Sequence, residues 1–312
     1  MRGLLILDVT NDSGRPLPSD WCETVGVPSL TRLRYDSPSA DPFLELLLRT
    51  HAATLRHVEL HRLDDVPAVL LARALQLRSL KCLPCEGLSK LVDLPGLAHI
   101  DLYCEGGSDD QEGAAFPPGT LAFLSGASHL RSVKLCLSAE DPDAPLRALS
   151  TSPSAQHLQE LVALADNEDP PETFVTTLVT PFLPSFTSLR TLIVDDDLEQ
   201  DFLLAVSPTV LPCLTTLKVD VLEDSCMHGT LHRPAVHDVL MRNPHLHLYI
   251  EKGFPEKVMC NDCPWCKWGC HELLAETKNS EVCYSSHSKS ATCPKECFQA
   301  FSPSNPLHPS NN

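Results

Sequence analysis

One short phrase, leucine–x–x–apolar–x–apolar, returns along about the first 250 residues of this chain and constrains its fold more than any other feature. Successive copies begin 20 to 33 residues apart, and nine copies at this spacing do not arise by chance in a leucine-rich chain. A repeat of this length predicts units that stack on one another. The copies begin at Leu4, Leu30, Leu55, Leu77, Leu97, Leu130, Leu158, Leu189 and Leu214, with a degenerate last copy near Leu246.

The spacing inside the phrase predicts a β-strand in every copy. The second and third apolar residues are two apart, so on a strand they point to the same, inner face, while the first leucine turns into the core just before the strand. Segments 41–53 and 67–77 have helical spacing, and the polar inserts 105–120 and 138–145 predict mobile loops. We expect parallel strands with buried centres at Leu7, Leu33, Val58, Leu80, Ile100, Val133, Leu161, Leu192 and Leu217.

This phrase at this period resembles the leucine-rich repeat superfamily over about residues 1–250. The resemblance implies an α/β solenoid, a horseshoe with a parallel sheet on its concave side. Its unequal periods resemble the irregular intracellular kind found in F-box proteins, although no F-box segment precedes the repeats. No capping unit precedes the first copy, so we expect an incomplete chain in which Leu4, Leu5 and Leu7 lie on an exposed apolar end.

Charge and hydropathy exclude two classes of partner. The net charge of −17 and the pI of about 5.1 argue against nucleic acid and anionic membrane, which both need a basic face. No apolar run is long enough for a signal-peptide core or a membrane span. Scattered cysteines such as Cys82 and Cys85 are expected to be buried thiols in a reducing compartment. We therefore expect a cytoplasmic or nuclear protein.

The outward strand positions form the candidate binding surface. They are mostly charged and alternate in sign up to the sixth strand, then become more apolar on the seventh and eighth. A mixed-charge face with an apolar anchor suits a protein partner. No catalytic motif accompanies it, and the acidic run at 195–197 is expected to be a solvated strand end. The predicted partner-binding residues are Arg34, Glu59, Lys81, Asp101, Tyr103, Lys134, Val162, Leu164 and Ile193.

A cysteine- and histidine-rich segment follows the last repeat. Disulfides are one alternative, but the chain shows no secretion signal. A redox pair is another, but the segment lacks a fold that would activate a thiolate. Thiolates and imidazoles two to four residues apart favour structural zinc, whose binding would supply the folding energy of a segment with little core. The predicted ligands form four short pairs: Cys260 with Cys263, Cys266 with Cys270, Cys283 with His287, and Cys293 with Cys297.

Together these features predict a solenoid over residues 1–252, a small zinc-binding module over 253–300 and a disordered tail over 301–312. The predicted function is a non-enzymatic protein-interaction scaffold. The resemblance implies substrate recognition for an F-box-type ubiquitin ligase, with ligase subunits among the partners. The alternative is a fragment of an extracellular or lumenal leucine-rich repeat receptor whose cysteine-rich end is a disulfide-bonded cap.

Overall fold

The structure is a computed structural model that describes residues 5–11, 28–38, 41–62, 67–103, 115–137, 140–165, 174–195, 200–220, 234–251, 281–286, 293 and 297–299. The chain divides into two compact units. Unit 1 comprises Met1–Leu158 with Asp166–Glu168, and unit 2 comprises Gln159–Ala165 with Asp169–Asn312. No helix in the described ranges is long and apolar enough to cross a membrane. The predicted domain boundary at 252/253 lies outside the described residues, so the division into solenoid, module and tail stays a prediction.

The described part of unit 1 contains six strands that pair in chain order, all parallel. The same position of the phrase is paired on every pair of neighbouring strands, so the repeats are in register. The successive partners are Leu7, Leu33, Val58, Leu80, Ile100 and Val133. This confirms the predicted parallel sheet. The strands are β1 (Ile6–Thr10), β2 (Arg32–Asp36), β3 (His57–His61), β4 (Ser79–Cys82), β5 (His99–Leu102) and β6 (Ser132–Leu137).

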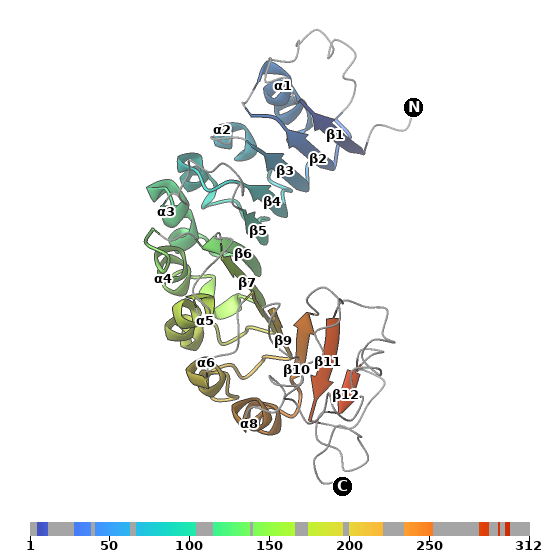
Figure 1. Ribbon diagram of the computed structural model, residues 1–312. Coiled ribbons are helices and arrows are strands. Elements are labelled where there is room, and N and C mark those ends of the chain that lie inside the picture. The colour runs from blue at the N-terminus through green and yellow to red at the C-terminus, as the bar shows by residue number, and fades with distance from the viewer. Residues whose placement is uncertain are drawn as a thin grey trace. The chain divides into compact units, whose positions relative to one another are not determined.

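The core of unit 1 lies between this sheet and the helices, which cover one face of the strands (Figure 1). The central residues of β2 to β6 are at most 2 % exposed, and so are the leucines that open their phrases. Leu7 is the exception, because it is only half-buried. Its strand pairs with β2 alone among the described residues, and its neighbours Leu5 and Ile6 are 59 % and 62 % exposed.

From the second repeat of unit 1 onward, the two shortest repeats, which begin at Leu55 and Leu77, hold the least helix among the described residues. The predicted helix at 41–53 is confirmed as α1 (Pro42–His51), but the segment 67–77 contains only α2 (Ala68–Leu71) followed by turns. The 20-residue repeat that begins at Leu77 holds a 3₁₀ helix, η2 (Glu86–Leu91). A shorter repeat must return to the next strand sooner, so fewer residues are left for helix. The longer repeats that follow contain α3 (Pro118–Gly126), α4 (Ala144–Ser150) and η3 (Ala155–His157).

Both predicted loops extend too far into the fold, so the predicted ends of these inserts are wrong. α3 begins at Pro118, and the buried Thr120 hydroxyl donates to the Cys85 carbonyl and accepts from the Cys85 amide. Gly119 fits because a Cβ there would come within 2.0 Å of the Glu86 carbonyl oxygen. α4 likewise begins at Ala144, which is buried. The composition of the two inserts predicts loops to their ends. Packing against the preceding repeat instead orders Gly119 and Thr120 in α3.

Buried polar groups fix the start of α1. Asp41 caps the helix by accepting from the Leu44 amide at 2.9 Å, and its other oxygen accepts from the Tyr35 hydroxyl at 2.6 Å. Burial, together with this bond and the charge of Asp41, raises the pKa of Tyr35 well above its usual range. At the other end of α1, His51 Nδ1 accepts from the Ser29 and Leu30 amides at 3.3 and 3.4 Å. These bonds fasten α1 to the strand phrase of its own repeat.

Unit 2 repeats the same design. β7 (Glu160–Ala165), β8 (Thr191–Val194), β9 (Thr216–Asp220) and β10 (His247–Glu251) are parallel, with Leu161, Leu192, Leu217 and Leu248 as register partners. This confirms the last predicted strands and adds β10 at the degenerate copy. Helical segments cover one face of these strands (Figure 1). They are α5 (Phe174–Val179), η4 (Thr180–Ser185), α6 (Gln200–Ala205) and α8 (Pro234–Arg242).

Two further strands, which the repeat phrase did not predict, end the described part of unit 2. β11 (Glu281–Ser285) pairs antiparallel with β10, and β12 (Cys297–Gln299) pairs parallel with β11. Cys283 and Tyr284 of β11 are buried, with Tyr284 0 % exposed. Part of the cysteine-rich segment therefore extends the sheet of the last repeat.

Candidate protein-interaction face

The outward residues of unit 1 form a ladder of alternating charge on the sheet face opposite the helices. Arg34, Glu59, Lys81, Asp101 and Lys134 are successive register partners, and Asp8 precedes them on β1. Neighbouring strands lie about 4.8 Å apart, so each charge meets an opposite charge on the next strand. Five of the predicted partner-binding residues are thus in one row.

Ion pairs link this row across the strands. Lys81 Nζ lies 3.7 Å from Asp101 Oδ2, and Arg34 Nη1 lies 4.0 Å from Asp8 Oδ2. Arg32 Nη2 donates to Glu59 Oε1 at 2.6 Å. The paired side chains stay 23 % to 60 % exposed, so each pair stabilises the fold by about 1 kcal/mol or less. Their main effect is to present fixed charges of both signs to the solvent.

Tyr103 gathers part of this face into a cluster at the carboxyl ends of β3, β4 and β5. Its hydroxyl accepts from the Arg62 amide at 2.9 Å and donates to the Leu60 carbonyl at 3.1 Å, so the side chain crosses from β5 to β3. The Tyr103 ring centroid lies 5.3 Å from that of His61 and 5.4 Å from Lys81 Nζ. A half-buried aromatic ring flanked by a cation and an imidazole is typical of a protein-binding hot spot.

The loop that leaves β3 supports this cluster. Arg62 has a φ of 60°, a left-handed conformation that costs a non-glycine residue about 1 kcal/mol. The hydrogen bond from the Arg62 amide to the Tyr103 hydroxyl stabilises this conformation. The ion pair between Arg62 Nε and Asp36 Oδ1 at 2.5 Å stabilises it as well. His61 and Arg62 were not among the predicted partner-binding residues. Their positions just after a strand phrase are the only sequence signal that could have suggested them.

Two buried polar atoms of the cluster have unmet hydrogen-bonding capacity within the described part of the chain. His61 Nε2 and Asp101 Oδ1 are buried and have no hydrogen-bond partner among the described residues. His61 Nε2 lies 3.9 Å from Glu59 Oε2, which is beyond hydrogen-bond distance. A buried polar atom costs free energy unless it is satisfied, so the packing of this cluster has a local cost.

The local charges set the protonation state of the cluster. Burial lowers the pKa of His61, and the charges of Lys81 and Arg34 lower it further, outweighing Asp36 and Glu59. Burial acts to raise the pKa of Glu59, but its hydrogen bond to Arg32 and the charges of Arg32, His61 and Lys81 hold that pKa below its usual value. The face therefore carries a neutral imidazole beside an ionised carboxylate near neutral pH.

We expect the stability of this region to fall as the pH is lowered through about 6.5. Burial lowers the pKa of His51 and His57 as well as that of His61, so the folded state binds fewer protons than the unfolded chain below the ordinary histidine pKa of 6.5. The measurement is the urea midpoint between pH 7.5 and 5.5. The variant His61→Gln should show a shallower dependence, and a slope equal to that of the parent would contradict the assignment.

In unit 2 the central outward positions of β7 and β8 are apolar, as the sequence indicates. Val162 and Ile193 are register partners, and both are half-buried together with Leu164. Asp195, at the end of β8, accepts from the Ala165 amide at 2.9 and 3.0 Å. That bond gives the first residue of the acidic run a structural role at the strand end. Binding of a partner by Val162, Leu164 and Ile193 stays a prediction.

Only part of the predicted zinc site falls within the described residues. Cys260, Cys263, Cys266, Cys270 and His287 lie outside them. Cys283 and Cys297 are register partners on β11 and β12, and Cys293 is half-buried. Within the described ranges, no group of three or more histidine, cysteine or acidic residues is arranged to hold a metal ion. The zinc site stays a prediction.

Comparison with known proteins gives similarities to solved structures. The chain is similar to the crystal structure of the leucine-rich repeat-containing protein LegL7 from Legionella pneumophila, with a TM-score of 0.45 and 12 % identity over 88 % of this chain and 99 % of that one. No protein-family model matches the sequence, and no curated protein matches it. The architecture of stacked parallel repeats follows from the strand register and the buried phrase positions within each unit.

Proposed function

We propose that this protein is a non-enzymatic scaffold that binds a protein partner through the outward face of its sheet. The observation that carries the proposal is the Tyr103 cluster, where a half-buried ring, fixed charges of both signs and two unsatisfied buried polar atoms meet on one exposed face. Charge ladders steer and orient a partner, and aromatic anchors supply affinity. Arg34, Glu59, Lys81, Asp101, Tyr103 and Lys134 are the contact residues on unit 1.

As a finer proposal, the scaffold recognises substrates for an F-box-type ubiquitin ligase in the cytoplasm or nucleus. Its support is the unequal repeat length, which resembles the intracellular kind of leucine-rich repeat. The Cys82 thiol adds support, because burial, with the nearby Cys85 and Asp101, raises its pKa well above the usual range and leaves it inert in β4. The alternative is an extracellular or lumenal receptor fragment. A secreted or lumenal partner would favour it over the intracellular scaffold.

The experiment is site-specific photo-cross-linking of the full chain in cells. A photoreactive amino acid at Lys81 should capture a discrete partner, whereas one at Val69, which is 55 % exposed on α2, should not. Ligase subunits and intracellular proteins among the captured partners support the finer proposal, and secreted or lumenal ligands support the alternative.

Charge reversal on the face provides the quantitative test. We expect Arg34→Glu/Lys81→Glu to lower the yield of cross-linked partner at least tenfold. The matched control is Arg49→Glu/Arg147→Glu, which reverses two exposed, ion-paired arginines on α1 and α4. Equal loss in both variants would show a general charge effect and contradict binding by the sheet face.

We also propose that the cysteine-rich segment binds structural zinc through Cys260, Cys263, Cys266, Cys270, Cys283, His287, Cys293 and Cys297. The supporting observation is that Cys283 and Cys297, which belong to different sequence pairs, are register partners on adjacent strands. Parallel partners of this kind lie about 4.8 Å apart, within the reach of one four-coordinate ion.

A further inference from the structure

A row of arginines lies at the edge of unit 1 where the strands begin. Within unit 1, the residue after the opening leucine of the phrase is arginine in three copies, Arg56, Arg78 and Arg131, and Ala98 takes this position in the copy between the last two. Backbone hydrogen bonds stack these positions. Ala98 and His99 both donate to the Arg78 carbonyl at 3.0 Å, and Arg131 donates to the Ala98 carbonyl at 2.8 Å. The row therefore runs across β3 to β6 at one residue per strand.

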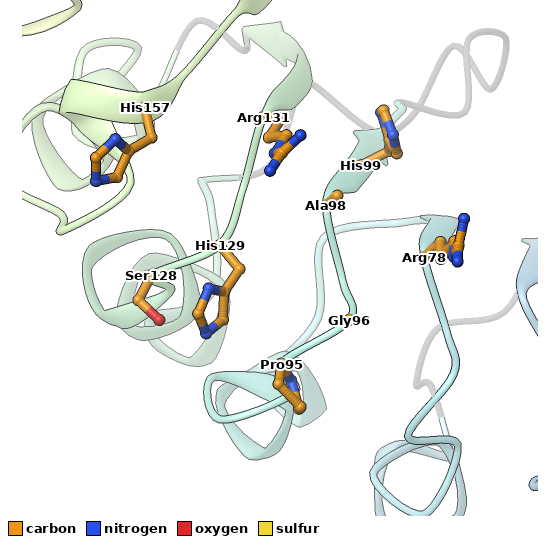
Figure 2. A pocket seen from close by; sticks show the side chains of 9 residues that line it. All are labelled: Arg78, Pro95, Gly96, Ala98, His99, Ser128, His129, Arg131 and His157. Carbon is orange, nitrogen blue, oxygen red and sulfur yellow. The ribbon is translucent and has the colours of Figure 1, made fainter.

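A pocket of about 390 Å³ opens beside this row. Figure 2 shows that its side chains come from successive segments between repeats, with Arg78, His99 and Arg131 at the strand ends and His129 and Ser128 on the turn before Arg131. Gly96 and Ala98 line it with almost no side chain, and a Cβ on Gly96 would come within 2.8 Å of the Leu77 carbonyl oxygen. Glycine at 96 therefore permits the close approach of two turns, and only the methyl group of Ala98 lies between Arg78 and Arg131 in the row.

The pocket is positive and its charges are not neutralised. Its polar lining consists of two arginines, three histidines and one serine, with no carboxylate. Among the described residues, Arg78 and Arg131 form no ion pair, unlike Arg32, Arg34 and Arg62 on the sheet face. Neighbouring His57 responds to this charge, since its pKa is lowered by burial and then by Arg32, His99, Arg78 and Arg56. Such a pocket is unexpected in a chain with a net charge of −17.

We propose that this pocket binds the phosphate group of a phosphorylated side chain on an extended segment of a partner protein. Two guanidinium groups suit bidentate contacts to phosphate oxygens, and the imidazoles of His99, His129 and His157 and the hydroxyl of Ser128 are further donors. A phosphorylated side chain carries a charge of about −1.5 to −2 at pH 7, which matches two unpaired arginines better than one carboxylate does.

The row of arginines favours a protein segment as the source of the phosphate. From Arg131 to Arg56 the row crosses three strand intervals, or about 14 Å at the usual strand spacing, which an extended peptide of four to five residues spans. Acidic residues beside the phosphorylated one would then meet Arg56. A nucleic acid is a poorer source of the phosphate, because its many phosphate groups would be repelled by a chain with a net charge of −17. The inference rests on the proposed role in protein interaction but uses residues separate from the Tyr103 cluster.

The test measures the binding of a fluorescent peptide library to the full chain by anisotropy. The library is degenerate except for a central phosphoserine, and its matched twin carries serine there. We expect the phosphorylated library to bind with a dissociation constant at least tenfold lower than that of its twin. Arg78→Gln/Arg131→Gln should abolish this difference, whereas Arg49→Gln/Arg147→Gln, which removes the same charge from α1 and α4, should preserve it.

Three outcomes would overturn the inference. They are equal binding of the two libraries, no effect of Arg78→Gln/Arg131→Gln, and an equal loss in the control variant. Inorganic phosphate that competes at the same concentration as the phosphopeptide would assign the pocket to a free anion instead of a protein segment. The result is independent of the sheet face, because Arg34→Glu/Lys81→Glu should leave phosphopeptide binding within about twofold of the parent.

Discussion

Replacing Leu80 by alanine is expected to lower the free energy of unfolding by about 2–5 kcal/mol. Leu80 is 0 % exposed at the centre of β4, and its register partners are Val58 and Ile100 on the two neighbouring strands. The truncation would leave a cavity between three repeats that close-packed neighbours fill only in part. Urea unfolding followed by circular dichroism measures the loss.

The control for this prediction is Leu75→Ala in the preceding repeat. Leu75 is 67 % exposed, so the change should stay within about 0.5 kcal/mol. Similar losses in the two variants would mean that Leu80 is not a core residue, and would contradict the register of the sheet. Because each repeat contacts mainly its neighbours, the Leu80→Ala variant should also broaden the unfolding transition.

Chain purified in reductant is expected to carry about two zinc ions, because eight ligands fill two four-coordinate sites. Cys263→Ser should lower the metal content by about one ion per chain and expose the cysteine-rich segment to protease, since metal binding supplies the folding energy of a segment with little core. The repeats should keep their circular dichroism. Elemental analysis and limited proteolysis with and without chelator measure these effects.

Cys213→Ser provides the matched control for the metal. Cys213 is an exposed thiol in unit 2 that is not among the predicted ligands, so its replacement should leave the metal content unchanged. A metal content near zero in the parent, with proteolysis unchanged by chelator, would contradict the zinc proposal. A shift in mobility between reducing and non-reducing gels would then favour the disulfide alternative.

The strands of this protein were predictable because their signal is local. A strand that buries one face repeats every two residues, and a register slip of one would turn every core leucine to solvent. The phrases that contain Leu33, Val58 and Leu80 therefore identify both the strand and its inner face. The outward row from Arg34 to Lys134 follows directly, because it consists of the residues between the buried ones.

The helical side was less predictable, since packing and repeat length decide it. Segment 67–77 has helical spacing, yet only Ala68–Leu71 form a helix, because the chain must reach β4 within a short repeat. Thr120 belongs to a segment of loop-like composition, yet it is buried and bonds to Cys85, 35 residues away. Neither outcome can be read from a window of neighbouring residues.

The sequence alone determined the stacked repeats, the inner and outer face of each strand and the alternating charges, because all three follow from a period of two within a repeated phrase. Only the tertiary structure decided which side chains meet. Tyr103 reaches Leu60 and Arg62 across 43 and 41 residues, and Arg78 and Arg131 flank one pocket because two backbone hydrogen bonds stack their repeats through Ala98. Contacts of this kind depend on the length of the connections between strands, which no local pattern encodes.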